Sequence, residues 1–202
     1  MKASWYTACV NTTIPTDRRI MDVAQRLMQV RGYNAFSYAD IADDVGVRKA
    51  TIHHHFPSKG ELARSVVVRY RAATRAMLAA IDRETADPRR KLERYAALYG
   101  AMLRDGPRLC LCALLAAELP TLPDAVRAEV GAFYADHEAW LGRVLQDGAA
   151  AGTLRVDGPV ETAAQLALAG IEGAMLVARA HGDPERFDAI ARRLLDALVV
   201  PV

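Results

Sequence analysis

Cysteine is scarce in this chain. Three cysteines, Cys9, Cys110 and Cys112, occur among 202 residues. An odd and sparse set argues against a disulfide scaffold and against a four-cysteine metal site, and it suits a reducing compartment. The composition of 52% apolar and 25% charged residues is that of an ordinary globular protein with one or two modest domains.

A long hydrophobic run is also missing. No window holds eighteen uninterrupted apolar residues, because the longest candidate, residues 163–178, contains Gln165 and Glu172. Residues 1–15 have only a short apolar run and lack the hydrophobic core of a secretory signal, so we expect a frayed leader there. The sequence therefore predicts a cytoplasmic protein without a membrane partner.

The motifs of common enzyme classes are absent as well. The sequence has no glycine-rich nucleotide loop, no His-Glu-x-x-His zinc motif and no nucleophile elbow. His137 and His181 lack an adjacent acid-base partner in the sequence, although distant residues can still meet in space. We predict no catalytic residues, no cofactor and no enzymatic activity.

The formal net charge of +2 is divided unevenly along the chain. Residues 16–75 hold 11 Lys and Arg against 6 Asp and Glu, whereas residues 76–202 hold 14 against 18. The positive surplus of the first region suits the phosphate backbone of DNA, and the acidic remainder would be repelled from that backbone. This distribution indicates nucleic-acid binding by the N-terminal part.

Residues 37–59 have the pattern of two short helices joined by a tight turn. Ser37 can cap the first helix, with Asp40 three residues later in a weak variant of the capping box. Gly46 then permits a turn in which a side chain would clash. This arrangement is typical of a helix-turn-helix DNA reader.

The second of these helices, about residues 48–54, carries hydrogen-bonding groups. Val47, Ala50 and Ile52 are expected to pack inward, and the other side chains are donors suited to phosphates and base edges. A cation at the start of the following helix also attracts phosphate. The candidates for contacts at or near bases are Arg48, Lys49 and Thr51, and those for phosphate contacts are Ser37, His53, His54 and Lys59.

Three consecutive histidines, His53, His54 and His55, raise the question of metal binding. Adjacent side chains on a helix point about 100° apart, and no carboxylate or cysteine stands at a useful spacing. We therefore predict no metal site. His53 and His54 are expected to face DNA, whereas His55 beside Phe56 is expected to pack.

Helical periodicity continues through the rest of the chain, and no segment reads as a confident strand. A brief extended stretch is expected at residues 153–156, and the helix at 159–180 is so apolar that we expect it to be buried. The sequence predicts an all-α protein with nine helices, three of them in the N-terminal head. Their expected ranges are residues 16–31, 37–45, 48–54, 59–84, 88–104, 107–119, 124–150, 159–180 and 184–199.

An aromatic and sulfur-containing group falls on the expected inner faces of the later helices. Such side chains either line an apolar ligand cavity with a few polar handles or simply fill a core, and the sequence leaves both possibilities open. The group consists of Tyr99, Met102, Phe133, His137 and Trp140.

Cys110 falls at about the fourth residue of the helix expected to start near Pro107, with Arg108 close by. A helix N-terminus and a nearby cation both lower the pKa of a thiol, as a redox or electrophile sensor requires. The alternative is a small buried core thiol. Cys112 lies on nearly the opposite face, so no disulfide between the two is expected within one helix, and a disulfide between subunits stays open as an alternative.

The stretch from residue 20 to about residue 70 resembles the TetR family of bacterial repressors. The matching residues are Phe36-Ser37, Asp40-Ile41-Ala42, Val45-Gly46-Val47, Thr51 to Phe56, Ser58-Lys59 and Leu62. The resemblance implies a DNA operator, a small-molecule pocket in the C-terminal domain, and a homodimer joined by a four-helix bundle of the last two helices. The family usually has tyrosine where this chain has His53, whose imidazole can still donate to a phosphate.

Residues 108–123 resemble a branch of that family that responds to reactive electrophiles or acrylate, in which a Cys-Leu step sits at this helix start. Cys110 matches the cysteine of that step, whereas Leu109 and Leu114 replace residues that are often glycine and asparagine. The resemblance implies that Cys110 belongs with the ligand-binding residues.

These observations predict a flexible leader at residues 1–15, a helix-turn-helix DNA-binding domain at 16–62, and a helical ligand-binding and dimerisation domain at 63–202. The predicted function is a homodimeric repressor released from a palindromic operator by a small-molecule ligand or by cysteine modification. Glu172 is expected either to bind a ligand cation or to pair across the dimer, and we favour pairing across the dimer. Two alternatives remain: an architectural DNA-binding protein without an effector response, and a helical small-molecule-binding or enzymatic protein.

Overall fold

A computed structural model describes residues 14–106 and 108–200. The structure confirms the predicted all-α class, since it is 78% helical and the described residues form nine α-helices and no strand. Most of the predicted leader lies outside the described residues. The helices are α1 (Thr16–Arg31), α2 (Tyr38–Val45), α3 (Lys49–His55), α4 (Lys59–Glu84), α5 (Pro88–Arg104), α6 (Leu111–Ala117), the 3-10 helix η1 (Leu119–Thr121), α7 (Asp124–Ala150), α8 (Val160–His181) and α9 (Pro184–Asp196).

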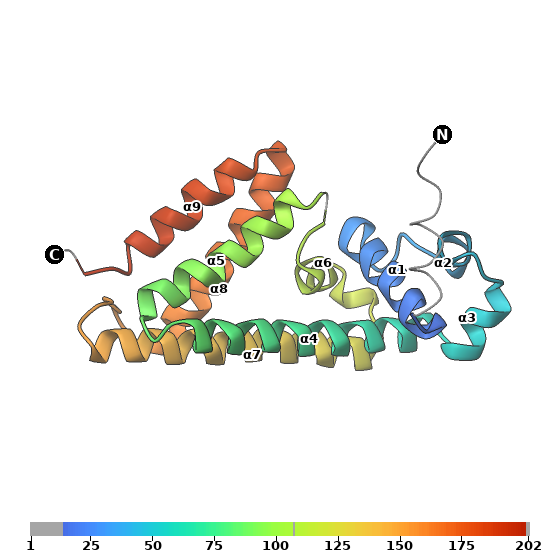
Figure 1. The fold of residues 1–202 in the computed structure, drawn as a ribbon, viewed down its shortest axis with the longest axis horizontal. Coiled ribbons are helices and arrows are strands. Elements are labelled where there is room, and N and C mark those ends of the chain that lie inside the picture. Colours follow the sequence, from blue (N-terminus) through green and yellow to red (C-terminus); the bar gives the residue numbers. More distant parts are fainter. Residues whose placement is uncertain (1–13, 107, 201–202) are drawn as a thin grey trace, which may run out of the picture.

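Helices α4 and α7 form the long axis of the molecule (Figure 1). They run side by side in the same direction, because Arg64 pairs with Glu129 and Arg71 with Asp136 at the same sequence offset. The head, made of α1 to α3, lies at the start of α4, and the body, made of α5 to α9, packs along the rest of it. The predicted domain boundary after residue 62 therefore falls inside α4.

Two of the long helices start with side-chain caps. Ser58 accepts a hydrogen bond from the Glu61 N–H at 3.1 Å at the start of α4. Asp87 accepts one from the Arg89 N–H at 3.0 Å, and Pro88 opens α5 where its missing N–H costs nothing. Each cap satisfies an amide that has no partner within its helix, so the sequence sets both helix starts locally.

Helix α6 begins later than the sequence predicts. The expected start at Pro107 lies outside the described residues, and Cys110 is the N-cap of α6 rather than its fourth residue. Leu109 is bonded to the head instead of to its own helix. Its N–H donates to the Gln29 carbonyl at 3.1 Å, and its carbonyl accepts from Gln29 Nε2 at 2.9 Å.

Helix α9 ends at residue 196, three residues before the predicted end, because the chain turns back on the loop after α7. The Arg155 N–H donates to the Leu198 carbonyl at 2.7 Å, and Leu154 forms an isolated antiparallel bridge with Val199. This bridge lies within the extended stretch expected at residues 153–156. It closes one end of the body.

Helix α8 is long and apolar enough, by length and composition alone, to cross a membrane. In the structure it packs against α5, α7 and α9, which bury one of its faces. Leu166, Leu176 and Val177 stay exposed on it, Leu166 by 68%. The expectation that this helix is buried therefore holds for only one of its faces in the single chain.

Candidate functional site

Helices α2 and α3 form the predicted helix-turn-helix. A capping box starts α2, in which the Asp40 carboxylate accepts from the Ser37 N–H at 2.7 Å and the Ser37 side chain accepts from a first-turn amide. Gly46 ends α2 at a φ of 73°, a conformation that side chains disfavour. The Tyr38 hydroxyl donates to the Phe56 carbonyl at 2.8 Å, which ties α2 to the end of α3.

Helix α3 packs on the head through one buried residue, and most of its other side chains are exposed. Ile52 is fully buried, whereas Ala50 is exposed, so the prediction that Ala50 packs inward is wrong. With a single anchor, a helix of two turns leaves most of its surface available to a partner. The exposed side chains are Arg48, Lys49, His53, His54 and His55, and Thr51 is half-buried.

Arg48 and Lys49 differ from the cations of the head that are paired with a carboxylate, Arg26 and Arg31. Arg26, for example, is paired with the Asp44 carboxylate. No carboxylate pairs with Arg48 or Lys49 among the residues that the structure describes. Their positive charge is therefore uncompensated and directed to solvent, as a phosphate-binding surface requires.

Two of the predicted phosphate contacts are already used inside the head. The Ser37 hydroxyl donates to the Asp40 carboxylate at 2.7 Å. The Lys59 ammonium donates to the Phe36 carbonyl and lies 4.2 Å from the centre of the Phe36 ring and 4.6 Å from that of Tyr33. Burial lowers the pKa of Lys59. Phosphate binding by Ser37 or Lys59 stays a prediction. Each side chain would have to bind a phosphate in addition to its internal partner.

The histidines of α3 have few internal contacts. His53 Nδ1 lies 3.4 Å from the Pro57 carbonyl, and its ring lies 4.7 Å from the ring of Tyr38. His55 is exposed, with its ring 6.4 Å from that of Phe56, so the prediction that it packs is wrong. Within residues 14–106 and 108–200, no group of three potential metal ligands comes together.

The head is tied to the body at the C-terminal end of α1. Besides the two bonds between Gln29 and Leu109, Arg179 of α8 donates to the Val30 carbonyl at 3.1 Å. Carbonyls at a helix end have no partner within the helix, so these groups of the body complete α1. The buried Gln29 side chain also lies 3.9 Å from the Met102 sulfur on α5.

A second tie joins the turn after α1 to the end of α6. The Glu118 carboxylate accepts from the Tyr33 N–H, from the Asn34 N–H at 3.1 Å and from Asn34 Nδ2 at 3.0 Å. Hydrogen bonds to a charged acceptor are stronger than neutral ones. The position of the head therefore depends on α6 as well as on α4.

A cavity of about 450 Å³ lies between α1, α4, α5 and α7, next to the Gln29 side chain that bonds the head to the body. Its volume is in the range of small-molecule sites, and most of its wall is apolar. The residues that line it are Gln25 and Gln29 of α1, Tyr70, Thr74, Met77 and Leu78 of α4, Leu98, Tyr99, Ala101 and Met102 of α5, Asp105 and Arg108 of the following segment, and Phe133 and His137 of α7.

Two of the predicted ligand-binding residues lie outside the cavity lining. Trp140 Nε1 donates to the Asp82 carboxylate at 3.0 Å, and the indole stacks on the Tyr95 ring, so Trp140 joins α7 to α4 and α5. Cys110 lies at the start of α6 and is not among the lining residues. The predicted residues that do line the cavity are Tyr99, Met102, Phe133 and His137.

His137 is a buried imidazole at the end of a chain of hydroxyl groups. The Tyr95 hydroxyl lies 3.0 Å from His137 Nδ1 and 3.1 Å from the Tyr99 hydroxyl. Burial lowers the pKa of His137 to about 4, and the neighbouring Asp136 charge offsets this only in part. His137 is therefore neutral at physiological pH. Its Nε2 atom has no hydrogen-bond partner among the described residues.

Cys110 and Cys112 are fully buried free thiols. Burial, followed by the Glu172 carboxylate, raises the pKa of the Cys110 thiol well above its ordinary value, and burial raises that of Cys112. The prediction of a lowered pKa at Cys110 is therefore wrong. Solvent is excluded from the thiol, and the nearby cation, Arg108, is paired with Asp105.

Glu172 of α8 is buried within the single chain, with 7% of its surface exposed. This position contradicts the prediction that it pairs across a dimer. Burial raises its pKa to about 7, and the Cys110 thiol is a weak donor to it. Neither carboxyl oxygen has a nitrogen or oxygen partner in the described part of the chain. A buried carboxyl group without such a partner favours its protonated form.

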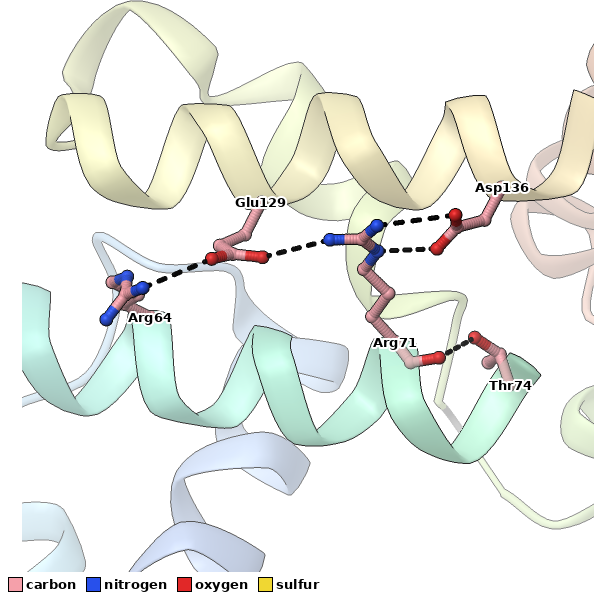
Figure 2. A network of polar contacts seen from close by, with 5 residues as sticks. All are labelled: Arg64, Arg71, Thr74, Glu129 and Asp136. Carbon is pink, nitrogen blue, oxygen red and sulfur yellow. Dashed lines mark hydrogen bonds and ion pairs between the residues drawn. The ribbon is translucent and has the colours of Figure 1, made fainter. Parts of the chain in front are cut away.

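An ion-pair network holds α4 against α7 next to the cavity (Figure 2). Arg71 Nε lies 2.5 Å from Asp136 Oδ2, and Arg71 Nη1 lies 3.4 Å from Glu129 Oε2. Arg64 reaches the other oxygen of Glu129 at 3.4 Å. Arg71, Glu129 and Asp136 are about three-quarters buried, which screens this network less than a surface pair. The two long helices are therefore fastened along one side of the cavity.

Sequence reasoning missed the contributions of α1 and α4 to the cavity. Gln29 carried a usable signal, because it is a polar residue on the apolar face of α1. Tyr70 and Met77 were recognisable only as part of the apolar stripe of α4, which is the pattern of any core helix. Thr74 has no distinctive pattern, since its place in the lining depends on how α4 packs against α5.

A helix-turn-helix with an outward cationic helix, joined to a helical body that holds a cavity, defines a DNA-binding regulator. Residues 20–66 match the family model described as bacterial regulatory proteins, tetR family, and residues 88–194 match the model described as tetracyclin repressor-like, C-terminal domain. The chain therefore belongs to the TetR family. It is a transcriptional regulator that binds DNA.

Relatives that cover nearly the whole chain agree with this assignment. The HTH-type transcriptional repressor DhaR of Mycobacterium sp. (strain GP1) is 24% identical over 92% of this chain and 93% of its own length. A TetR family regulator from Agrobacterium tumefaciens is 40% identical with a TM-score of 0.89, over 92% of this chain and 98% of that one. A TetR regulator from Legionella pneumophila is 26% identical with a TM-score of 0.83, over the same shares. These relatives are regulators rather than enzymes, and they do not assign the chain to the electrophile-responsive branch.

Proposed function

We propose that this protein is a homodimeric cytoplasmic repressor that a small molecule in the cavity releases from a near-palindromic operator. The observation that carries the proposal is the double use of Gln29. Its side chain lines the cavity and at the same time bonds the head to Leu109 of the body. A ligand in the cavity therefore lies in contact with a residue that positions the head.

In the proposed complex, α3 of each subunit enters the major groove. Arg48, Lys49 and Thr51 make the contacts at or near bases, and His53 and His54 reach phosphates. Two heads of one dimer would read half-sites about one helical turn apart, roughly 34–36 Å. The uncompensated charge of Arg48 and Lys49 supports this orientation.

The proposed dimer forms through α8 and α9. Leu166, Leu176 and Val177 supply an exposed apolar face on α8 that the single chain leaves uncovered. We expect Leu166→Glu to shift the protein from dimer to monomer in analytical ultracentrifugation, because a charge in an apolar interface must be desolvated. Leu119→Glu is the matched control, since Leu119 is also exposed but lies on η1. Equal behaviour of the two variants would contradict the dimer surface.

Release from the operator requires that ligand binding in the cavity be coupled to the arrangement of the head. A ligand acts only if it binds the DNA-incompetent arrangement more tightly, and a coupling of about 1–3 kcal/mol changes operator affinity roughly 5- to 150-fold. We expect Gln29→Leu to alter the response to ligand more than Gln25→Leu, because both residues line the cavity but Gln29 alone of the two bonds to Leu109.

The decisive experiment is selection of bound DNA from a random pool with the full-length protein. The proposal predicts a near-palindromic consensus and a steep loss of affinity with salt. Binding without a sequence preference would favour an architectural protein instead. Absence of salt-sensitive DNA binding would favour a helical small-molecule-binding or enzymatic protein.

Cysteine modification is not the proposed route of release. N-ethylmaleimide should leave operator binding unchanged in a Cys9→Ser variant, whose remaining thiols, Cys110 and Cys112, are buried. Rapid alkylation accompanied by loss of operator binding would overturn this expectation.

A further inference from the structure

The Tyr99–Tyr95–His137 chain has a direction that its hydrogen-bond partners determine. Each tyrosine hydroxyl has one proton. In the described part of the chain, the Tyr95 hydroxyl is the only hydrogen-bond partner of the Tyr99 hydroxyl. A phenol O–H is a stronger donor than a neutral imidazole N–H, and an imidazole nitrogen is a stronger acceptor than a phenol oxygen, so Tyr95 donates to Nδ1 of His137 and Tyr99 donates to Tyr95. One donor at an end of the chain is left without an acceptor in either direction, and in this direction it is the imidazole N–H.

This direction determines the tautomer of His137. A neutral imidazole whose Nδ1 accepts a hydrogen bond carries its proton on Nε2. His137 is 3% exposed, lines the cavity, and has no partner for Nε2. A buried N–H without an acceptor is unfavourable. A ligand that supplies an acceptor recovers this free energy.

The charge of the cavity restricts the ligand further. The two charged residues of its lining, Asp105 and Arg108, are paired with each other, and their side chains are 71% and 34% exposed. They therefore lie toward solvent and nearly neutralise each other. Around His137 the wall is apolar and aromatic, with Phe133 4.2 Å from the imidazole between ring centres. An ion placed there would lose its hydration without a counter-ion.

We propose that the effector is an uncharged, mostly apolar molecule whose carbonyl or ether oxygen accepts a hydrogen bond from His137 Nε2–H. Tyr95 and Tyr99 act as positioning residues, because they hold the imidazole in the donor tautomer. This inference rests on the proposed function, since it names the chemical class of the molecule that the cavity takes.

A set of four naphthalene derivatives of similar shape tests this proposal in calorimetric titrations of the full-length protein. Methyl naphthyl ketone carries the acceptor, ethylnaphthalene lacks it, naphthoate is an anion and naphthylethylamine is a cation. We expect the ketone to bind about tenfold more tightly than the hydrocarbon, and both ions to bind more weakly than the ketone. Tighter binding of either ion, or no binding of any probe, would overturn the proposal.

Three variants assign the preference to the imidazole. His137→Phe keeps a buried ring but removes the donor, so the ratio of ketone to hydrocarbon affinity should fall to about one. Tyr95→Phe keeps the imidazole but frees its tautomer, so the ratio should lie between those of the wild type and His137→Phe. Leu98→Ala, in the same cavity, should weaken both probes without changing their ratio. An unchanged ratio in both His137→Phe and Tyr95→Phe would overturn the proposal.

Operator binding measured without any probe distinguishes a failure of the proposed function from a failure of the His137 assignment. A wild-type protein that selects no operator contradicts the proposed function. A protein that binds its operator normally but shows no preference for the ketone contradicts only the assignment of His137. Circular dichroism of each variant verifies that the fold is intact, and Tyr95→Phe provides the test if His137→Phe does not fold.

Discussion

Helix α3 of the head places its polar side chains outside, whereas the body buries some of its own. His53 and His54 of α3 are exposed in the head, while His137 and Glu172 of the body are almost fully buried. The outward groups of the head are available to a large, charged partner. Burial favours the neutral forms of both groups of the body, which suits a small, uncharged partner.

The largest expected effect concerns the two buried groups of the body, which act on stability in opposite directions with pH. Burial raises the pKa of Glu172 from 4.5 to about 7, so its contribution to stability is present below pH 4.5 and is lost as pH rises to 7. Burial lowers the pKa of His137 from 6.5 to about 4, so its contribution is present above pH 6.5 and is lost as pH falls to 4. Each contribution is on the order of 3 kcal/mol.

Thermal or urea unfolding at pH 5 and pH 8 tests these signs. The stability of Glu172→Gln relative to the wild type should be higher at pH 8 than at pH 5. Glu172 of the wild type ionises at a lower pH in the unfolded state than in the folded state, so its ionisation favours unfolding. The stability of His137→Phe relative to the wild type should instead be higher at pH 5 than at pH 8. If the stability difference from the wild type is the same at both pH values for both variants, these groups are not buried and neutral, and the contrast with the head disappears.

The second prediction concerns the outward cations of the head. Arg48→Ala should weaken operator binding by about 1–3 kcal/mol, or roughly 5- to 150-fold, and blur the sequence preference. Stability should change little, because Arg48 is exposed and has no carboxylate partner in the described residues. Fluorescence anisotropy with the selected operator measures the affinity. Arg94→Ala, an exposed arginine of the body, is the control and should leave it unchanged.

A third, smaller effect is expected where head and body meet. Glu118→Gln removes the charge that three donors of Tyr33 and Asn34 share, at a cost of about 1 kcal/mol. The amides of Tyr33 and Asn34 should then exchange hydrogen about fivefold faster, while amides of α7 stay protected. Hydrogen exchange followed by NMR measures this, with Glu93→Gln as a surface control. Equal acceleration throughout the chain would indicate global destabilisation instead.

The smallest effect distinguishes Lys49 of α3 from Lys59 at the start of α4. Lys49→Ala should reduce the salt slope of DNA binding by about one, because its ammonium is free to meet a phosphate. Lys59→Ala should instead lower stability by about 0.5–1 kcal/mol through the lost contacts with Tyr33 and Phe36. Salt titrations and thermal unfolding of both variants measure the difference. A reduced salt slope for Lys59→Ala would confirm its predicted phosphate contact.

The head could be predicted from sequence in some detail because its signals are local. The Ser37–Asp40 capping box and the Gly46 turn act within a few residues, and both occur in the structure as predicted. Ala50 and His55 were misplaced because the pattern of a two-turn helix does not settle which residues face a neighbour. The roles of Arg48, Lys49 and the histidines on DNA remain predictions.

The cavity was predictable only in part. Tyr99, Met102, Phe133 and His137 were recognisable as apolar or aromatic residues on inner faces, and all four line it. Trp140 has the same pattern but bonds to Asp82, which lies 58 positions away in the sequence. Nothing in the local sequence pattern of α7 shows that Phe133 and His137 line the cavity whereas Trp140 does not.

The order and type of the helices, the head motif and the basic charge of the N-terminal part were determined by the sequence alone, since periodicity, caps and turns act over a few residues. Only the tertiary structure decided the state of Cys110, Glu172 and His137. Their protonation depends on which distant side chains exclude water from them. The link through Gln29 was decided in the same way, because one end of α1 is completed by residues about 80 and 150 positions further along the chain.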